Sequence, residues 1–289
     1  MKKTGIVTDS HSAISKETAE ELGIMVLPMP FYIEETCFLE GEDISWDELM
    51  NQLKEEKKIT TSQPSPVAVM EIWDKALEQY EEILYLPISS GLSGSCSSAM
   101  AMAQEEKYQG KVFVVDNGRV ATPLHQSILD AIELLEEGKS AAEVKERLEA
   151  SRARMGIYIA VDDLKYLKNG GRISAATAVV GSLLKIKPVL YFDVGMLEMH
   201  QKCRGIQKAK TQMIEAVKQD FETKYPEELK KGEIRLLAAS SADEEKTKAW
   251  VEMIQEAFPG MEVLCDRLSF GVSCHIGPGG FGIGYSCKP

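Results

Sequence analysis

Three short segments concentrate small hydroxyl residues, glycine and histidine, which are residue types that bind or attack a small polar group. The first is TTSQPSP, residues 60–66, where two prolines stiffen a run of hydroxyls before a predicted helix. The second is SSGLSGSCSS, residues 89–98, directly after a predicted buried strand. The third is CHIGPGGFGIG, residues 274–284, where His275 precedes five glycines and a proline. Hydroxyls, backbone N–H groups and one histidine suit the binding of a small carboxylate or phosphate better than bond cleavage.

The position of the second segment favours ligand binding over helix capping alone. Its glycines let the backbone approach a ligand closely, and its serines lie where a helix begins beyond the carboxyl end of a parallel strand. Free N–H groups and the positive end of the helix dipole attract an anion at such a place. Taken alone, the hydroxyls of residues 60–66 are better explained by the N-cap of the following helix than by ligand binding. A single histidine is more often structural, but one in a flexible glycine loop can reach a site.

Two enzyme classes are alternatives to a binding protein. A serine esterase or acyl hydrolase would use Ser93 with His275 and Asp116, but the G-x-S-x-G pattern fails because Gly94 follows Ser93 directly. A nucleotide-binding protein or small-molecule kinase lacks support because no phosphate-loop lysine pattern occurs, and residues 9–11 are Asp-Ser-His rather than a glycine-rich turn. We expect no catalytic residue and no cofactor. We also expect no metal site, because the histidines and cysteines are scattered without ligand spacing.

The elements that position the first two segments alternate along residues 1–155. Short β-branched runs are predicted as strands at residues 5–8, 83–88 and 112–115, and a further extended segment starts at residue 24. Capped amphipathic helices are predicted at residues 15–22, 45–56, 66–80, 93–108, 123–137 and 140–152. Strands that alternate with helices over short loops predict parallel pairing and a doubly wound sheet.

Residues 156–289 show a different order. Strands are predicted at residues 156–161, 188–192, 196–202, 234–239, 261–268 and the C-terminus, and helices near residues 174–184, 206–224 and up to 258. The turn at residues 193–195 makes a hairpin among crossover connections, which predicts a mixed sheet. We therefore expect an α/β protein of two domains, an N-terminal one of residues 1–155 and a C-terminal mixed one of residues 156–289.

The composition of the chain indicates its cellular compartment and excludes some classes of binding partner. The 289 residues include 33 Lys and Arg against 45 Asp and Glu, for a net charge of −12, so the surface repels nucleic acid and anionic lipid. Because no stretch approaches the ~18 apolar residues of a membrane helix, and the start of the chain lacks a signal-peptide core, we expect a cytoplasmic protein without stable membrane insertion or nucleic-acid binding. The six cysteines are expected to be reduced thiols.

One basic stretch runs against the acidic average. Between residues 164 and 187 there are five cations and no acidic residue: Lys165, Lys168, Arg172, Lys185 and Lys187. These are either solvated helix ends or a docking patch for an acidic partner or for anionic lipid.

Five motifs follow one another over nearly the whole chain: TSQPS at 61–65, SSGLSG at 89–94, LKYLKNGGRIS at 164–174, IKPVL at 186–190 and HIGPGG at 275–280. In this order they resemble the DegV family of bacterial fatty-acid-binding proteins. The resemblance implies two α/β domains and a long-chain fatty acid, of the palmitate, stearate or oleate type, in a narrow apolar tunnel.

The resemblance also implies roles for individual residues. Hydrogen bonds to the carboxylate would come from Thr61, Ser62, Ser93 and the Gly94 N–H. His275 would lie beside the head group, and Arg172 and Arg204 would form the supporting polar network. In some relatives a separate fatty acid kinase phosphorylates the bound acid, so such a kinase subunit is an expected partner.

Overall fold

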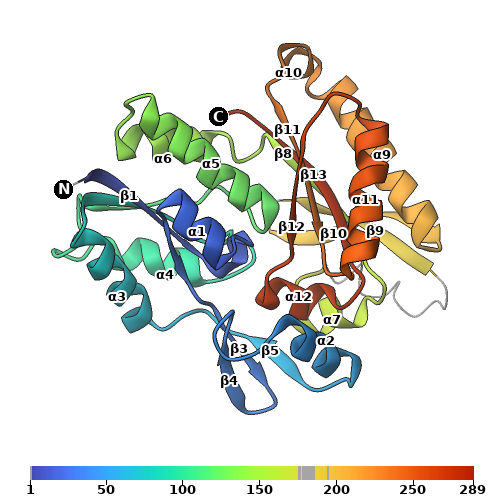
Figure 1. Ribbon diagram of the computed structural model, residues 1–289, viewed down its shortest axis with the longest axis horizontal. Coiled ribbons are helices and arrows are strands. Elements are labelled where there is room, and N and C mark those ends of the chain that lie inside the picture. The colour runs from blue at the N-terminus through green and yellow to red at the C-terminus, as the bar shows by residue number, and fades with distance from the viewer. Residues whose placement is uncertain (1, 175–176, 178–185, 194) are drawn as a thin grey trace.

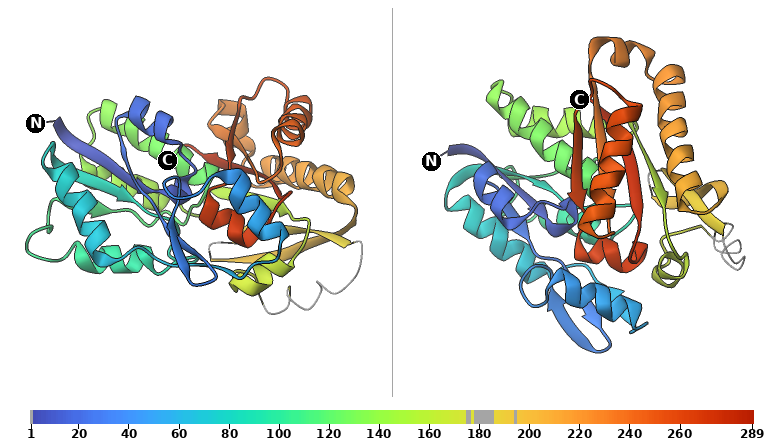
Figure 2. Two further views of the ribbon diagram at one scale, coloured as in Figure 1. Left: turned by 60° about the horizontal axis from the view of Figure 1, so that its bottom comes forward. Right: turned by 45° about the vertical axis from the view of Figure 1, so that its right-hand side comes forward.

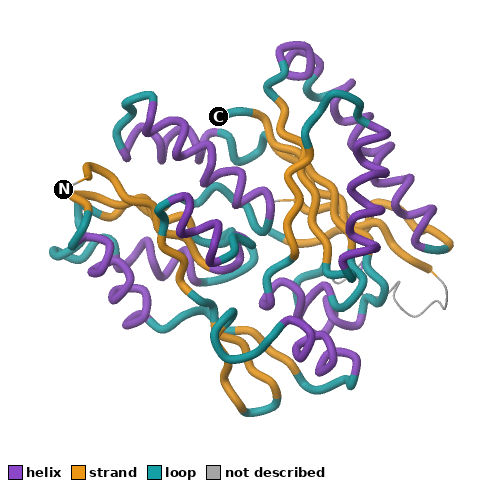
Figure 3. Tube along the Cα trace, viewed as in Figure 1, coloured by secondary structure: helices purple, strands orange, loops and turns teal. Residues whose placement is uncertain are grey.

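The computed structural model describes residues 2–174, 177, 186–193 and 195–289, which form three sheets with helices packed against them (Figure 1). The helix predicted near residues 174–184 and Lys185 lie outside the described residues, apart from Ser174 and Thr177. The tube view separates strands from the helices that cover them (Figure 3). No helix in the described ranges is long and apolar enough to cross a membrane.

Sheet A is parallel and belongs to the N-terminal half. Its strand order is β2 (Met25–Leu27), β1 (Lys2–Asp9), β6 (Tyr80–Leu86) and β7 (Val112–Val114). Along β6, Leu84 and Leu86 pack towards one face while Ile83 and Tyr85 pack towards the other, as the period of two requires. The first face is covered by α1 (Lys16–Leu22), α5 (Thr122–Glu136) and α6 (Ala141–Ala150), and the second by α3 (Pro66–Leu77) and α4 (Ser95–Met102). The doubly wound parallel sheet is confirmed.

Sheet C is mixed and belongs to the C-terminal half. Its strand order is β10 (Met196–Arg204), β9 (Ile186–Asp193), β8 (Met155–Ala160), β13 (Phe281–Cys287), β11 (Ile234–Ser240) and β12 (Val263–Arg267). Among the described strands of this sheet, β11 and β12 pair in parallel and the other neighbours pair antiparallel. Helices α9 (Ile206–Thr223) and α11 (Glu244–Ala257) share a core with one face, and α10 (Pro226–Lys231) follows α9. The mixed sheet is confirmed, and the boundary at residue 155, where β8 begins, stays a prediction.

Strand β13 is central to sheet C and presents different residues to its two faces. Phe281, Ile283 and Tyr285 belong to the core beneath α9 and α11. Gly282 and Gly284 therefore lie on the opposite face. That face is shared with α7 (Lys165–Gly170), α12 (Phe270–Ile276) and the start of α5. Two glycines in a central strand leave this face without side chains along part of its length.

Sheet B was not expected from the sequence, which predicted one extended segment from residue 24. It is antiparallel, with the order β4 (Thr36–Leu39), β3 (Pro30–Ile33) and β5 (Ile59–Thr61), and α2 (Trp46–Lys54) connects β4 to β5. We call residues 30–61 the arm. The arm reaches from sheet A to the C-terminal half, where α2 contacts α12 (Figure 2). Leu49, Met50 and Leu53 of α2 form a small core with Cys274, Tyr166 and Phe270.

Candidate ligand-binding cavity

A cavity of about 370 Å³ lies where the carboxyl edge of sheet A meets the open face of sheet C. Its walls come from both halves of the chain: the loops after β1, β5 and β6, the start of α5, the face of sheet C, and helices α7 and α12. Helix α5 joins the two sheets because it contacts β11, β12 and β13, and the Thr122 hydroxyl at its start donates to the Ala238 carbonyl at 2.8 Å. A volume of this size is that of a small-ligand pocket.

Most of the cavity wall is apolar. Sheet C contributes residues mostly of the face opposite α9 and α11: Ile157, Ile159, Phe192, Leu197, Leu237, Ala238, Ala239, Gly282 and Gly284. The room beside these residues depends on the two glycines of β13. A Cβ at Gly282 would meet no atom closer than 3.7 Å, whereas one at Gly284 would lie 2.7 Å from the Gly156 carbonyl oxygen. The first position therefore has room for a Cβ at ordinary contact distances, whereas the second requires glycine for close strand packing.

Polar groups gather at one part of the wall, and six of the seven residues implied by the resemblance are among them: Thr61, Ser62, Ser93, Gly94, Arg172 and His275. The two hydroxyl loops touch, because a Cβ at Gly94 would lie 2.9 Å from Gln63 Oε1. Thr61 Oγ1 and His275 Nε2 are hydrogen-bonded at 2.9 Å. Ser62, Gln63 and Gly94 are exposed, so this part of the cavity faces solvent.

Arg204 is not brought to the cavity. It is the last residue of the edge strand β10, its side chain is exposed, and it does not line the wall. The basic stretch is also partly neutralised. Lys165 pairs with Glu56 at 2.6 Å and Lys187 pairs with Asp162, which leaves Lys168 exposed at the end of α7.

His275 lies in the last turn of α12, which corrects the expectation of a flexible glycine loop. A Cβ at Gly170 would lie 1.9 Å from His275 Nδ1, so only glycine fits at the end of α7. Gly171 follows with φ +68° and ends the helix, and the Arg172 guanidinium donates back to the Gly170 carbonyl. Burial, and then the positive charge of Arg172, lower the pKa of His275 to about 4. The imidazole is therefore neutral near pH 7.

Ser93, His275 and Asp116 do not form the hydrogen-bonded chain that a serine hydrolase requires. His275 Nε2 bonds to Thr61, and the Ser93 hydroxyl accepts from the Ser95 N–H at 3.2 Å. Asp116 is paired with Arg152 and accepts from the Ser90 hydroxyl, both at 2.6 Å, rather than orienting the histidine. A nucleophile needs a base within hydrogen-bond reach. Ser93 and His275 instead contribute separate polar groups to one wall.

His11 lines the cavity and was missed by the sequence reasoning, although Asp9-Ser10-His11 was noted after the first strand. It lies in a short 3₁₀ helix, η1 (Ser10–Ser12), at the carboxyl edge of sheet A, and that position was the available signal. Burial, followed by the charges of His275 and Arg172, lowers the pKa of His11 to about 3.

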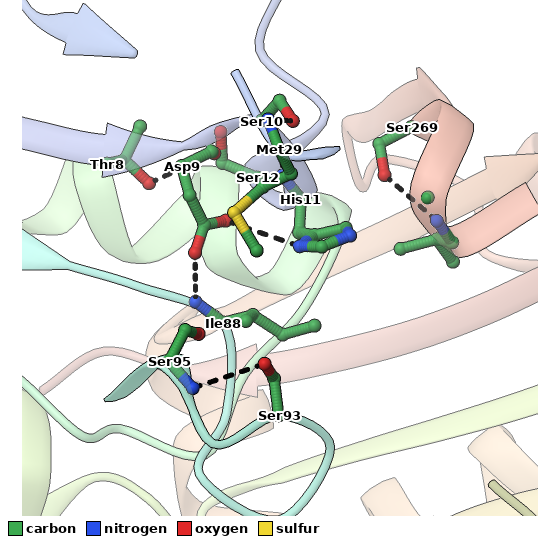
Figure 4. A network of polar contacts seen from close by, with 12 residues as sticks. Thr8, Asp9, Ser10, His11, Ser12, Met29, Ile88, Ser93, Ser95 and Ser269 are labelled. Carbon is green, nitrogen blue, oxygen red and sulfur yellow. Dashed lines mark hydrogen bonds and ion pairs between the residues drawn. The ribbon is translucent and has the colours of Figure 1, made fainter. Parts of the chain in front are cut away.

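Asp9 holds the loops beneath the polar wall together (Figure 4). Its carboxylate accepts from the His11 N–H at 3.0 Å and from the Ile88 N–H at 2.8 Å, which joins the ends of β1 and β6. Burial raises the pKa of Asp9 to about 7. Ser93 lies in the loop that begins at Ile88. The two hydrogen bonds of Asp9 therefore hold the loop of Ser93 next to the loop of His11.

No group of three or more metal-ligating side chains occurs in the part of the chain that the structure describes, and all six cysteines are free.

Comparison with known proteins agrees with this architecture. A family model described as "Uncharacterised protein, DegV family" matches residues 3–288. A DegV domain-containing protein of Deinococcus radiodurans is 32% identical over 279 residues, covering 96% of each chain. A solved structure described as fatty acid binding of a DegV family protein from Thermus thermophilus has a TM-score of 0.88 and 32% identity, covering 99% of each chain. Bacillus subtilis DegV, described as a fatty acid binding protein, has a TM-score of 0.84 and 28% identity over 100% of both chains. This chain therefore belongs to the DegV family.

Proposed function

We propose that this protein binds a long-chain fatty acid, of the palmitate, stearate or oleate type, in the cavity between its two sheets. The observation that carries the proposal is the division of one cavity into an apolar wall on sheet C and a polar, solvent-facing part at the hydroxyl loops. The fatty acids bound by the related Thermus thermophilus and Bacillus subtilis proteins have the same division into tail and head group.

The expected energetics match this division. Burial of about 14 methylenes at ~0.8 kcal/mol each gives a gross gain of about 11 kcal/mol before the costs of association. The tail therefore supplies most of the affinity. The head group needs orientation and hydrogen bonds, for which we propose Ser93, the Gly94 N–H, Thr61 and Ser62 as donors, with His275 and Arg172 beside them.

We further propose that the protein has no chemistry of its own and presents the carboxyl group to a separate kinase subunit. The exposed residues Ser62, Gln63 and Gly94 border the polar part of the cavity, so a partner can approach the head group from solvent. A serine esterase remains the rival, and turnover of a chromogenic acyl ester that Ser93→Ala abolishes would establish it.

The test is to denature the purified protein and identify the released lipid by mass spectrometry. We expect one long-chain fatty acid per chain, and lower occupancy in Ser93→Ala. Ser97→Ala is the matched control, because Ser97 lies on α4, four residues after Ser93, but is exposed and outside the cavity wall. Release of no lipid, together with no binding of added palmitate, would refute the proposal.

A further inference from the structure

Helix α12 joins the parts of the polar wall. This seven-residue helix contacts η1, β5, α2 and α7, so it touches the elements that carry His11, Thr61 and Gly170. Its own last turn carries His275. Because a helix this short moves as one body, a shift of its first residues also shifts the imidazole, about 7.5 Å further along the axis at 1.5 Å per residue.

The start of α12 is held by a carboxyl group from outside the helix. Glu40, which follows β4 in the arm, accepts from the Phe270 N–H, more weakly from the Gly271 N–H at 3.4 Å, and from the Ser10 hydroxyl at 2.7 Å. Ser269 caps the same helix by accepting from the Val272 N–H at 3.3 Å (Figure 4). The first three N–H groups of α12 therefore have acceptors, and two of those acceptors belong to Glu40.

Ion pairing does not explain the position of Glu40. Within the described ranges no lysine, arginine or histidine forms an ion pair with it. Burial, and then the neighbouring Asp9 carboxyl group, raise the pKa of Glu40 to about 7 against the lowering effect of its hydrogen bonds. A carboxyl group that is desolvated without a cation costs free energy. The Glu40 carboxyl group instead accepts from two backbone N–H groups of α12, in the C-terminal half, and from the Ser10 hydroxyl, in the N-terminal half. It therefore joins the two halves of the chain.

The packing around α12 leaves little tolerance. A Cβ at Gly271 would lie 2.3 Å from His11 Nε2, and one at Gly170 would lie 1.9 Å from His275 Nδ1. Both imidazoles thus contact a glycine on a facing element. A small rotation of α12 changes both contacts together, and with them the Thr61–His275 hydrogen bond of 2.9 Å.

We propose that Glu40 is a positioning residue for the polar wall: its carboxyl group fixes α12, and with it His275, against the loop that carries Ser10 and His11. The arm then serves to assemble a site whose halves come from different sheets. This inference rests on the proposed function for its effect on ligand binding. Its effect on the position of His275 is independent of any ligand.

The experiment compares Glu40→Ala and Glu40→Gln with the control Glu143→Ala, which removes a capping-box carboxylate from α6, away from the cavity. Affinities for palmitate and for methyl palmitate are measured, because the ester keeps the tail and loses the charged head group. We expect Glu40→Ala to lower the ratio of acid to ester affinity about tenfold, the equivalent of one charge-assisted hydrogen bond. Glu40→Gln keeps an acceptor for the Phe270 N–H and should keep the ratio, as should Glu143→Ala.

A second readout uses the lipid-free protein. The NMR signals of the His275 imidazole should shift in Glu40→Ala and stay in place in Glu143→Ala. An unchanged acid-to-ester ratio in folded Glu40→Ala, or equal losses in the Gln and Ala variants, would overturn the proposal. If Glu40→Ala does not fold, Ser10→Ala replaces it, since it removes the 2.7 Å bond to Glu40 and, besides that, only the 3.1 Å bond that the Ser10 hydroxyl accepts from the Met29 N–H. An unshifted His275 imidazole in folded Ser10→Ala would contradict the proposal. Wild-type protein that binds neither lipid refutes the proposed function, and the imidazole signals then decide the role of Glu40 alone.

Discussion

The space beside Gly282 predicts that ligand affinity falls with every carbon added at this position. Gly282 lines the cavity, and its missing Cβ would meet only ordinary contacts of 3.7 Å or more. Each carbon added there occupies room that a ligand methylene would fill, at about 0.8 kcal/mol per methylene. Gly282→Ala, →Val and →Leu add one, three and four carbons, so we expect losses of about 0.8, 2.4 and 3.2 kcal/mol. The last is roughly a 200-fold rise in Kd.

The assay is displacement of a fluorescent fatty acid by palmitate, with thermal melts of each variant. Stability should not fall in parallel with affinity. Residue 282 lies in a strand, where valine is preferred over glycine, and the Trp250 indole bonds to the backbone carbonyl of residue 282, which the substitutions keep. Gly284→Ala is the contrasting variant: its Cβ would lie 2.7 Å from the Gly156 carbonyl oxygen, so it should lower the melting temperature. Wild-type palmitate affinity in folded Gly282→Leu would refute the assignment of the tail to this cavity.

Two further predictions concern the polar wall. Gly170→Ala should displace the His275 imidazole, whose Nδ1 would lie 1.9 Å from the new Cβ, and should reduce acid but not methyl ester affinity; equal losses for both ligands would count against it. His275→Asn should reduce the loss of stability on acidification, because the pKa of His275 is lowered from 6.5 to about 4 in the folded protein. Between pH 6.5 and about 4, His275 binds a proton in the unfolded chain but not in the folded chain. As the pH is lowered through this range, the wild-type melting temperature should therefore fall relative to that of the variant. Parallel melting curves across this range would contradict the prediction.

The sequence was most informative where structure depends on local contacts. The capping boxes that begin at Ser45 and Ser140 form as predicted, because both partners of each box lie within one helical turn. The alternation of strands and helices likewise predicted sheet A. Helix α4 is shorter than expected, ending at Met102 rather than near residue 108, and β6 begins at Tyr80 inside the end of the predicted helix.

The arm shows why other elements were missed. Its strands are three or four residues long, too short for a clear period. The turn between β3 and β4 has Glu34 at φ +54°, where a glycine or asparagine would have signalled a hairpin. Helix α12 was missed because the glycines in and after it are typical of a loop. Glycines that resemble a loop are there because Gly271 and Gly277 admit the side chains of His11 and Tyr166.

In the candidate site, too, residues with local sequence signals could be predicted, and residues that depend on distant segments could not. The hydroxyl loops could be predicted because their residue types and their place after strands are local features. Glu40 could not be predicted, because its partners on α12 are distant in the chain, and for His11 the available signal was its place directly after β1. Arg204, implied only by resemblance, lies on an edge strand away from the cavity.

The apolar and polar parts of the cavity come from different elements, so ligand affinity and head-group orientation can be tested separately. The apolar wall comes mainly from sheet C, whereas Thr61, Ser62 and Ser93 come from loops of the N-terminal half and His275 from α12. A variant on β13 is therefore expected to change the contacts of the proposed lipid tail, which acid and ester share. A variant at Glu40 is expected to change the relation between the two halves at the proposed carboxylate site, and the methyl ester has no carboxylate. The arm would matter for ligand binding because its contacts with α12 help to fix the groups proposed to bind the carboxylate relative to one another.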